Sequence, residues 1–297
     1  MKKRIFITGI SSKIILALIE LIDLEEHEIF GLTRNPENLN LHPEINLIKG
    51  DITDYERIEN LIKECDLIIH AAAVTHSFDK EKYFNVNLHA TKKLVDLAST
   101  LDIGKFVFIS SNTASEKSGA YGLTKFLAEN YIADNLKNWL ILRPSEIYGG
   151  DSKEGIEKFV SEITYKSIIL YPTGVPSKFY PIHFEDVAEI IYNLVFEERI
   201  TNEKITICGP TGYSFSDVIS LTKNVNKRNT ITIPVLKSWM FLIQGITEKL
   251  PFFVGVIPDQ ISRLYGPKNL GSTKFRLGQK SFEDYLTERL FRDIKIQ

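Results

Sequence analysis

The chain has 297 residues, with 36 Lys and Arg against 38 Asp and Glu, a formal net charge of -2 and 43% hydrophobic residues. This length allows one large or two modest domains around a substantial core, and a content of two cysteines, Cys65 and Cys208, excludes a small disulfide-stapled fold. The balanced charge shows neither a nucleic-acid-binding surface nor an acidic tail, so an ordinary soluble protein without a nucleic-acid partner is expected.

Short apolar runs alternate with stretches of helical period through the first half of the chain. The pattern predicts strands at 4–8, 28–33, 45–48, 66–71, 105–110 and 139–143, and helices at 13–22, 55–64, 83–99 and 121–136. Strands alternating with helices of this length predict an α/β Rossmann fold, a doubly wound parallel sheet. We expect residues 1–150 to form the dinucleotide-binding domain and 151–297 mainly a smaller substrate-binding lobe, with 181–208 partly returning to the main sheet.

The N-terminal sequence Met-Lys-Lys-Arg runs directly into the first predicted strand and leaves no room for the apolar core of a signal peptide. A reducing cytoplasm is therefore the expected compartment. The apolar stretch Trp239 to Ile246 is interrupted by Gln244 and is too short to span a bilayer, which needs about 20 apolar residues. We expect no integral membrane segment, while a peripheral membrane contact stays open. None of the six His is spaced with Cys or carboxylates as metal ligands are, so no metal is expected.

Thr8 and Gly9 stand between the first predicted strand and the first predicted helix. In a Rossmann fold this turn binds the pyrophosphate of a dinucleotide, because backbone N–H groups and the helix dipole favour an anion there. Taken alone, the turn is equally consistent with an ordinary strand-to-helix connection.

Tyr121 and Lys125 are four residues apart and therefore share one face of a predicted helix. A phenol with a pKa near 10 is a poor base at neutral pH unless a cation stabilises the phenolate. Chance alone supplies about one such pair in a chain of this composition. The pair follows Ser110-Ser111, hydroxyls at the carboxyl end of a predicted parallel strand, where ligands of such sheets bind.

Eight stretches in order along the chain resemble the extended short-chain dehydrogenase/reductases of the NAD-dependent epimerase/dehydratase family, which mostly modify nucleotide sugars. They are FITG (6–9), GDITD (50–54), IIHAAA (68–73), VNLHAT (86–91), FVFISS (106–111), YGLTKFLAE (121–129), ILRPSEIYG (141–149) and PIHFEDVAEII (181–191). The C-terminal third adds only LGQKSFEDYL (277–286), similar to the closing segment of the family.

The resemblance implies a role for each matching residue. Tyr121 would be the general acid/base, Lys125 its pKa-lowering partner and ribose ligand, Ser111 the hydroxyl that orients the substrate carbonyl, and Asn87 a support of the proton relay. The cofactor would be held by Thr8, Gly9, Ser11, Ser12, Lys13, Ile14, Arg34, Asp51, Ile52, Ala71, Ala72, Ala73, Tyr121, Lys125, Pro144 and Ser145. The substrate would contact Ser111, Asn112 and Glu146. A capping Ser111, a surface Lys125 and a capping Asn87 are the structural alternatives.

The phosphate loop departs from the TGxxGxxG pattern of the family, since its second and third glycines are replaced by Ser12 and Ile15. These glycines allow close approach to the pyrophosphate and close helix packing, so cofactor affinity or pose is expected to change. Arg34 stands after the second strand in place of the acid that binds the ribose of NAD, and Lys13 adds a nearby cation. These two cations favour NADP over NAD, the alternative being that both are solvated surface charges.

The substrate side departs as well. Asn112 and Thr113 replace the acidic pair of the 4,6-dehydratases, so 4,6-dehydration is not expected. Glu146 replaces the asparagine that contacts the substrate diphosphate, and a carboxylate there would repel a diphosphate.

We therefore expect an NAD(P)-dependent 4-epimerase or 4-ketoreductase of a nucleotide sugar, with hydride transfer at C4 and Tyr121 as general acid/base. Two alternatives remain: a Rossmann cofactor-binding or regulatory protein with little or no turnover, and a reductase of a small non-nucleotide carbonyl. The resemblance also implies a homodimer formed through helices 83–99 and 121–136.

Overall fold

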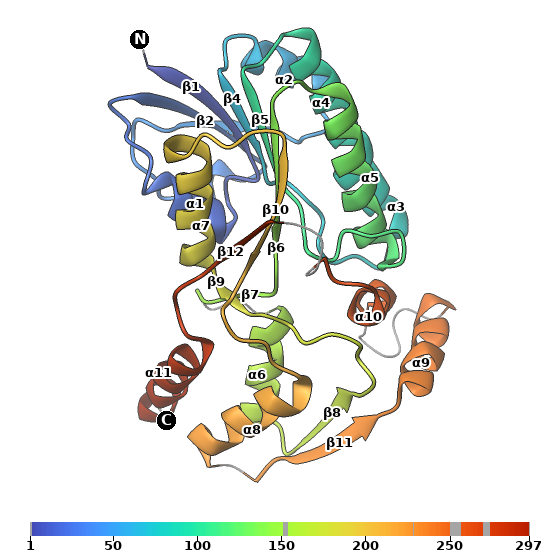
Figure 1. Cartoon of the computed structure of the whole chain (residues 1–297). Helices are drawn as coiled ribbons and strands as arrows, with labels where there is room; N and C mark the ends of the chain where they lie inside the picture. Colours follow the sequence, from blue (N-terminus) through green and yellow to red (C-terminus); the bar gives the residue numbers. More distant parts are fainter. Residues whose placement is uncertain (1, 151–153, 228, 250–256, 270–273, 297) are drawn as a thin grey trace.

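The computed structural model describes residues 2–150, 154–227, 229–249, 257–269 and 274–296, without the side chains of residues 292–296. Its centre is a sheet of 8 parallel strands (Figure 1). From one edge to the other these are β12 (Lys274–Leu277), β10 (Glu203–Cys208), β6 (Trp139–Pro144), β5 (Lys105–Ile109), β4 (Leu67–His70), β1 (Lys3–Thr8), β2 (His27–Thr33) and β3 (Asn46–Lys49). The doubly wound α/β Rossmann fold predicted from the sequence is confirmed.

Helices cover both faces of this sheet, because its central strands are apolar on both sides. On one face, α1 (Lys13–Ile19) and α7 (Phe184–Tyr192) bury a core with β1 and β6, and the π-helical turn η3 (Asn193–Glu197) follows α7. On the other face, α2 (Tyr55–Ile62), α4 (Thr91–Thr100) and α5 (Gly119–Asn135) bury a second core. The carboxyl ends of the strands all meet at the edge that faces the smaller lobe (Figure 1).

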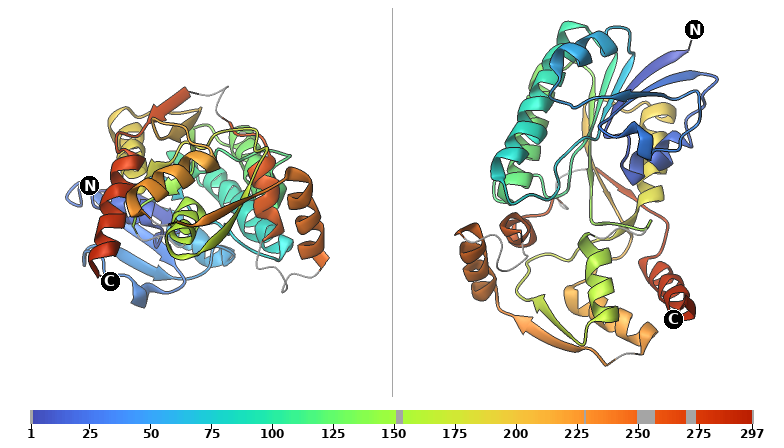
Figure 2. Two further views of the ribbon diagram at one scale, coloured as in Figure 1. Left: turned by 90° about the horizontal axis from the view of Figure 1, so that it is seen from below. Right: turned by 180° about the vertical axis from the view of Figure 1, so that it is seen from behind.

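The smaller lobe lies beyond that edge and packs around its own apolar cluster (Figure 2). Its elements are α6 (Gly155–Tyr165), the parallel pair β8 (Ile168–Pro172) and β11 (Ile231–Val235), α8 (Phe215–Asn226), α9 (Lys237–Lys249), α10 (Pro258–Tyr265) and α11 (Phe282–Ile296). The short pair β7 (Ile147–Tyr148) and β9 (Ile182–His183) stands between the two lobes. Segments 184–208 and 274–277 contribute to the main sheet or its covering layer.

Two predicted helices differ from those observed. The prediction of a helix over 13–22 is too long, since α1 ends at Ile19 and tighter turns follow, with Leu21 N bonded to Leu18 O. The prediction of one regular α-helix over 83–99 is wrong, because the first part of this segment is π-helical. The structure has a turn of helix, α3 (Lys80–Lys82), then a wider π-helical segment, η2 (Tyr83–Ala90), and then α4. The 3-10 turn η1 (Pro36–Asn38) lies after β2.

Within the described residues, no helix combines the length and apolarity that a membrane span requires. The same part of the chain contains no cluster of three or more His, Cys, Asp or Glu placed to hold a metal ion. Cys65 and Cys208 are buried free thiols.

Candidate active site

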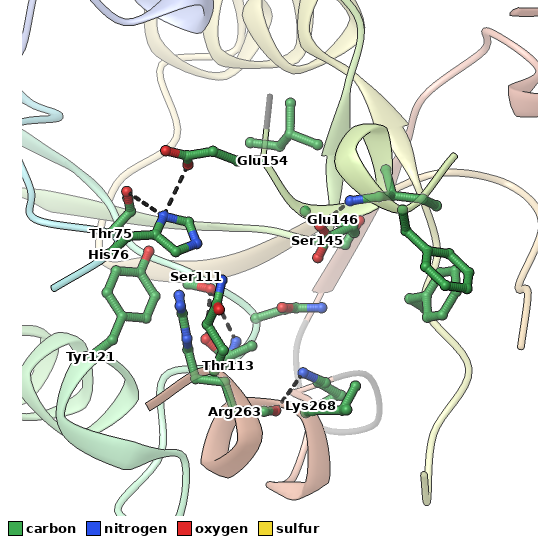
Figure 3. A pocket seen from close by; sticks show the side chains of 18 of the residues that line it. Thr75, His76, Ser111, Thr113, Tyr121, Ser145, Glu146, Glu154, Arg263 and Lys268 are labelled. Carbon is green, nitrogen blue, oxygen red and sulfur yellow. Dashed lines mark hydrogen bonds and ion pairs between the residues drawn. The ribbon is translucent and has the colours of Figure 1, made fainter. Parts of the chain in front are cut away.

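A cavity of about 730 Å³ lies between the carboxyl ends of the strands and the smaller lobe (Figure 3). It brings together two groups of residues that are far apart in the sequence. The N-terminal end of α1 and the loop before it contribute Ser11, Ser12, Lys13 and Ile14. The loops after β5 and β6 contribute Ser111, Asn112, Ser145 and Glu146, with Tyr121 between them. The cavity therefore joins the predicted phosphate loop to the predicted acid/base.

Tyr121 lies in the first turn of α5, 9% exposed, and its hydroxyl points into the cavity near Ser111 and His76 (Figure 3). Burial raises the pKa of Tyr121, while the cation of Arg263 and a hydrogen bond with Ser111 lower it. Ser111 Oγ is itself held 2.9 Å from Thr113 Oγ1. The two hydroxyls are thus placed to share a proton with one oxygen of a bound substrate.

Lys125 lies one turn along α5 and is 2% exposed. Its Nζ donates to the carbonyl oxygen of Ile109 at 2.8 Å and stands 4.5 Å from the ring centre of Phe108. Burial lowers the pKa of Lys125 to about 7, against the raising effect of Glu129. Arg263 is a cation that lowers the pKa of Tyr121 in this structure, and the role of Lys125 as a pKa-lowering partner stays a prediction.

Glu129 continues the same helix face as Tyr121 and Lys125 and is completely buried. Its carboxylate accepts from Ser110 Oγ at 2.5 Å and from Arg143 Nε at 2.9 Å. This network fixes the end of β5 and of β6, and with them the backbone that carries Ser111. Sequence reasoning missed Glu129, although it stands at helical spacing from the Tyr–Lys pair.

Arg263 reaches the site from α10, in the part of the chain that the resemblance does not cover. Its guanidinium carbon lies 4.7 Å from the ring centre of Tyr121, and its Nε lies 3.1 Å from Asp259 Oδ2. Asp259 Oδ1 also accepts from the backbone N–H of Tyr121 at 3.2 Å. Asp259 therefore holds Arg263 and the start of α5 together, an arrangement for which the sequence gives no spacing signal.

The substitution Arg263→Gln is expected to raise the pKa of Tyr121, because an opposite charge at this range stabilises the phenolate. The pH at which a reaction that uses the Tyr121 phenolate as a base reaches half of its maximum rate should move upward. Arg263→Lys keeps the charge, so its pH–rate profile should stay close to that of the unaltered protein. A pH–rate profile measures the shift, and identical profiles for the Gln variant and the unaltered protein would rule out this role.

The cavity that contains Tyr121 is also lined by His76, Glu154 and Lys268, which were not predicted as site residues, and by the predicted Glu146. His76 Nδ1 lies 2.9 Å from Glu154 Oε2, and burial followed by Arg263 lowers the pKa of His76. Lys268 donates to the carbonyl oxygen of Arg263, and burial lowers its pKa to about 8. Glu146 accepts a hydrogen bond from Ile156 N, at the start of α6, at 3.1 Å. Its carboxylate raises the pKa of Lys268, against the effect of burial. The charge of Glu146 is thus offset in part by groups around it.

The predicted phosphate loop begins with a close contact that only glycine allows. Gly9 has φ +70°, and a Cβ at this position would lie 2.6 Å from Ala72 N. Ser12 occupies the position of the second family glycine, and its Oγ accepts from Ile15 N at 3.4 Å as the cap of α1. Ile15, at the third position, is completely buried in the core with Ile5 and faces away from the cavity.

A buried chain of hydrogen bonds ties the ends of β1 and β4 to η2 and α4. Thr91 Oγ1 donates to Asn87 O, so it accepts from His70 Nε2 at 2.8 Å. His70 Nδ1 then accepts from Thr8 Oγ1 at 2.6 Å, and Thr8 Oγ1 accepts from Ala72 N. Burial, with a smaller effect of Lys125, lowers the pKa of His70 to about 3, which keeps the ring in the neutral form that this pattern requires.

Asn87 is 1% exposed, and its side-chain amide exchanges two hydrogen bonds with the backbone of Val74, at 2.7 and 2.9 Å. It therefore fixes the loop that follows β4, which contains Ala71, Ala72 and Ala73. In this structure Asn87 does not line the cavity that contains Tyr121.

The other predicted cofactor residues lie at or after the ends of strands, and of these Ser145 lines the cavity. Arg34 is exposed after β2, and Asp51 follows the neighbouring β3, where its carboxylate accepts from Thr53 N at 3.0 Å. Ile52 is buried in the core. Pro144 accepts from Asn112 N at 3.0 Å, and the hydroxyl of Ser145 donates to Tyr180 O. These residues lie along one edge of the sheet, beside the strands that carry Thr8 and Ser111.

Two solved structures have the fold of this chain at low sequence identity. A structure of UDP-glucuronic acid 4-epimerase from Bacillus cereus with a UDP-sugar analogue and NAD superposes with a TM-score of 0.72, at 17% identity, over 99% of this chain and 100% of that one. The Bordetella bronchiseptica enzyme WbmG in complex with NAD gives a TM-score of 0.71 at 16% identity, over 99% and 95%.

Among curated sequences, the mitochondrial NADH-ubiquinone oxidoreductase 40 kDa subunit of Neurospora crassa is 18% identical over 73% of this chain. The chain spans 57% of the length of that relative and 60% of a second mitochondrial one. The family model of NAD dependent epimerases/dehydratases matches residues 5–208, which contain the phosphate loop, Ser111, Tyr121 and Lys125. The chain belongs to the NAD-dependent epimerase/dehydratase family.

Proposed function

We propose that this protein is an NAD(P)-dependent 4-epimerase or 4-ketoreductase of a nucleotide sugar, with Tyr121 as the general acid/base. The observation that carries the proposal is the position of the Tyr121 hydroxyl. This hydroxyl forms a hydrogen bond with Ser111, and the cation of Arg263 lies over the Tyr121 ring. The same cavity is lined by residues Ser11 to Ile14.

The residues present fit a dinucleotide. The close approach of Gly9 to Ala72 leaves no room for a side chain at position 9. The backbone at the end of β1 is therefore open to a diphosphate. We assign the diphosphate to residues 11–14 with Ala71 to Ala73, the adenosine to Arg34, Asp51 and Ile52, the ribose to Lys125 and the nicotinamide to Pro144 and Ser145. When bound, NAD or NADP supplies the acceptor and donor of the hydride.

The chain's own residues would move the proton. Ser111 Oγ orients the reacting oxygen of the sugar, and the ionised Tyr121 accepts the hydroxyl proton as that carbon is oxidised. In the reverse direction Tyr121 donates the proton to the carbonyl oxygen. Arg263 and Ser111 counteract the burial that raises the pKa of Tyr121, so they help the phenol to work in both directions.

A nucleotide sugar suits the cavity in size and in charge. Its lining includes the cations Arg263, which is paired with Asp259, and Lys268, while the carboxylate of Glu146 accepts from Ile156 N. Binding of UDP-sugars by structural neighbours gives further support.

Turnover with a panel of nucleotide sugars tests the proposal. Conversion without net oxidation of the reduced cofactor indicates an epimerase, whereas stoichiometric oxidation with a 4-keto sugar nucleotide indicates a ketoreductase. Glu146 favours a second candidate, a reductase of a small carbonyl, because a carboxylate in the cavity disfavours a diphosphate. That candidate predicts activity on a small carbonyl with no affinity for any nucleotide sugar. Binding without turnover on any of these would favour the regulatory alternative.

Arg34→Ala is expected to weaken NADP binding about threefold to tenfold and to leave NAD binding unchanged, since an exposed guanidinium pairs with the 2′-phosphate only. Titration calorimetry with both cofactors measures the difference, and Lys93→Ala, an exposed cation on α4, is the control. Equal effects on the two cofactors would contradict the preference for NADP. The homodimer through helices 83–99 and 121–136 stays a prediction, as does the cytoplasmic compartment.

A further inference from the structure

The outer part of the smaller lobe presents an apolar face on a two-stranded sheet. The register of β8 and β11 pairs Ile168 with Ile231 and Leu170 with Ile233. These four side chains are 54%, 60%, 61% and 43% exposed, respectively, whereas the alternate residue Ile169 is 3% exposed in the core of the lobe. Because alternate residues of a strand point to opposite sides, the four exposed side chains share one face.

Further exposed apolar side chains lie on α9, which follows β11 directly (Figures 1 and 2). Trp239, Leu242 and Ile246 are 59%, 52% and 43% exposed and recur at intervals of three and four residues, so they share one side of the helix. Leu236, in the connection, is 60% exposed. Patches of this kind on a soluble protein mark an interaction site. We call these eight residues the apolar face.

Lysines outnumber carboxylates in the segments that carry the apolar face. Segments 162–178 and 215–249 contain six described lysines, Lys166, Lys178, Lys223, Lys227, Lys237 and Lys249, against Glu162, Asp217 and Glu248. Glu162 pairs with Lys166 at 2.8 Å, and Glu248 pairs with Lys80 of α3 at 3.0 Å. Lys166 and Lys227 precede the two strands, and Lys237 and Lys249 stand at the two ends of α9. The whole chain, by contrast, carries a net charge of -2.

We propose that the apolar face docks on an anionic phospholipid surface, with Trp239, Leu242 and Ile246 at the acyl boundary and the lysines at the headgroups. Exposed aromatic and aliphatic side chains flanked by lysines are the pattern of helices that lie in a membrane interface. A symmetric contact with a second copy is disfavoured, because each face would meet itself and bring lysines against lysines. The docking is peripheral, since α9 has 13 residues.

Vesicle flotation tests this proposal with the full chain. We expect binding to vesicles of phosphatidylcholine with phosphatidylglycerol, weaker binding to phosphatidylcholine alone, and release at high salt. The double variant Trp239→Ser/Leu242→Ser should bind at least about tenfold more weakly. Leu21→Ser, at a 40% exposed leucine outside the apolar face, should bind as the unaltered protein does. All three positions are exposed, so these substitutions leave the core intact.

A spectroscopic readout separates docking from loss of fold. The chain has two tryptophans, so Trp139→Phe leaves Trp239 as the single reporter. Its emission should shift to the blue on addition of anionic vesicles. Unchanged emission, or equal flotation of the double variant and the unaltered protein, would overturn the proposal. Self-association without lipid that the double variant abolishes, together with no vesicle binding, would also overturn it, in favour of a second copy.

Discussion

The substitution Tyr121→Phe is expected to lower kcat by about 10² to 10⁴ while leaving the fold intact. The change removes only the hydroxyl, which bonds to Ser111 and points into the cavity, and it keeps the ring that packs 6.3 Å from Tyr83 and below Arg263. The affinity for nucleotide sugars should change little, because the lost hydroxyl acts mainly in the proton transfer and not in substrate binding. Steady-state rates with the best substrate of the panel measure the effect.

Tyr131→Phe is the matched control. Tyr131 lies on the same helix, α5, and its hydroxyl donates to Asp96 Oδ1 at 2.6 Å, away from the cavity. It should turn over at the rate of the unaltered protein. If Tyr121→Phe and Tyr131→Phe behaved alike, the proton transfer would have to be assigned to another group.

The substitution Glu129→Ala is expected to lower the free energy of unfolding by about 3 to 5 kcal/mol, because it leaves a buried guanidinium without its carboxylate. Arg143 is 6% exposed and Glu129 is completely buried, so water cannot replace the lost partner. Ser110, which donates to Glu129, would also lose its acceptor. Glu129→Gln keeps an acceptor and should cost less. Urea denaturation of the three proteins measures these differences.

An exposed ion pair provides the comparison for this loss. Glu198 lies 2.6 Å from Arg276, with both side chains about two-fifths exposed. Glu198→Ala should cost less than about 1 kcal/mol, the range of surface pairs. A loss at Glu129 no larger than that at Glu198 would show that the buried network does not hold the ends of β5 and β6. Turnover should also fall in Glu129→Ala, because the network supports the backbone of Ser111.

The parallel sheet could be predicted from the sequence because its strands are continuous apolar runs separated by amphipathic helices. Helical spacing and the carboxyl end of one strand, both of which are local properties, drew attention to Tyr121 and Ser111, and the family resemblance then implied their roles. The sequence did not predict β12, since a four-residue edge strand whose residues pair with β10 residues 69 positions earlier leaves no periodic pattern. The π-helical turn of η2 likewise gives no distinct hydrophobic period.

The electrostatics of the site depend on contacts that sequence spacing does not encode. Arg263 and Asp259 reach Tyr121 across about 140 residues of chain, and Lys268 enters the cavity from the loop after α10. Lys125 donates to Ile109 O, and its predicted role beside Tyr121 stays a prediction. The family resemblance and local spacing therefore suggested the proposed reacting hydroxyls, whereas Arg263, which lowers the pKa of Tyr121, is brought to it by tertiary packing.

The central claim is that Tyr121 carries a proton during oxidation and reduction at C4 of a nucleotide sugar. A single-turnover experiment tests it most directly: protein loaded with the oxidised nicotinamide cofactor is mixed with a nucleotide sugar, and the absorbance of the reduced nicotinamide is followed. We predict that the reduced cofactor forms about 10² to 10⁴ times more slowly in Tyr121→Phe than in the unaltered protein, because the hydride leaves C4 only as the hydroxyl proton is removed. Formation of the reduced cofactor at equal rates in the two proteins would contradict the account.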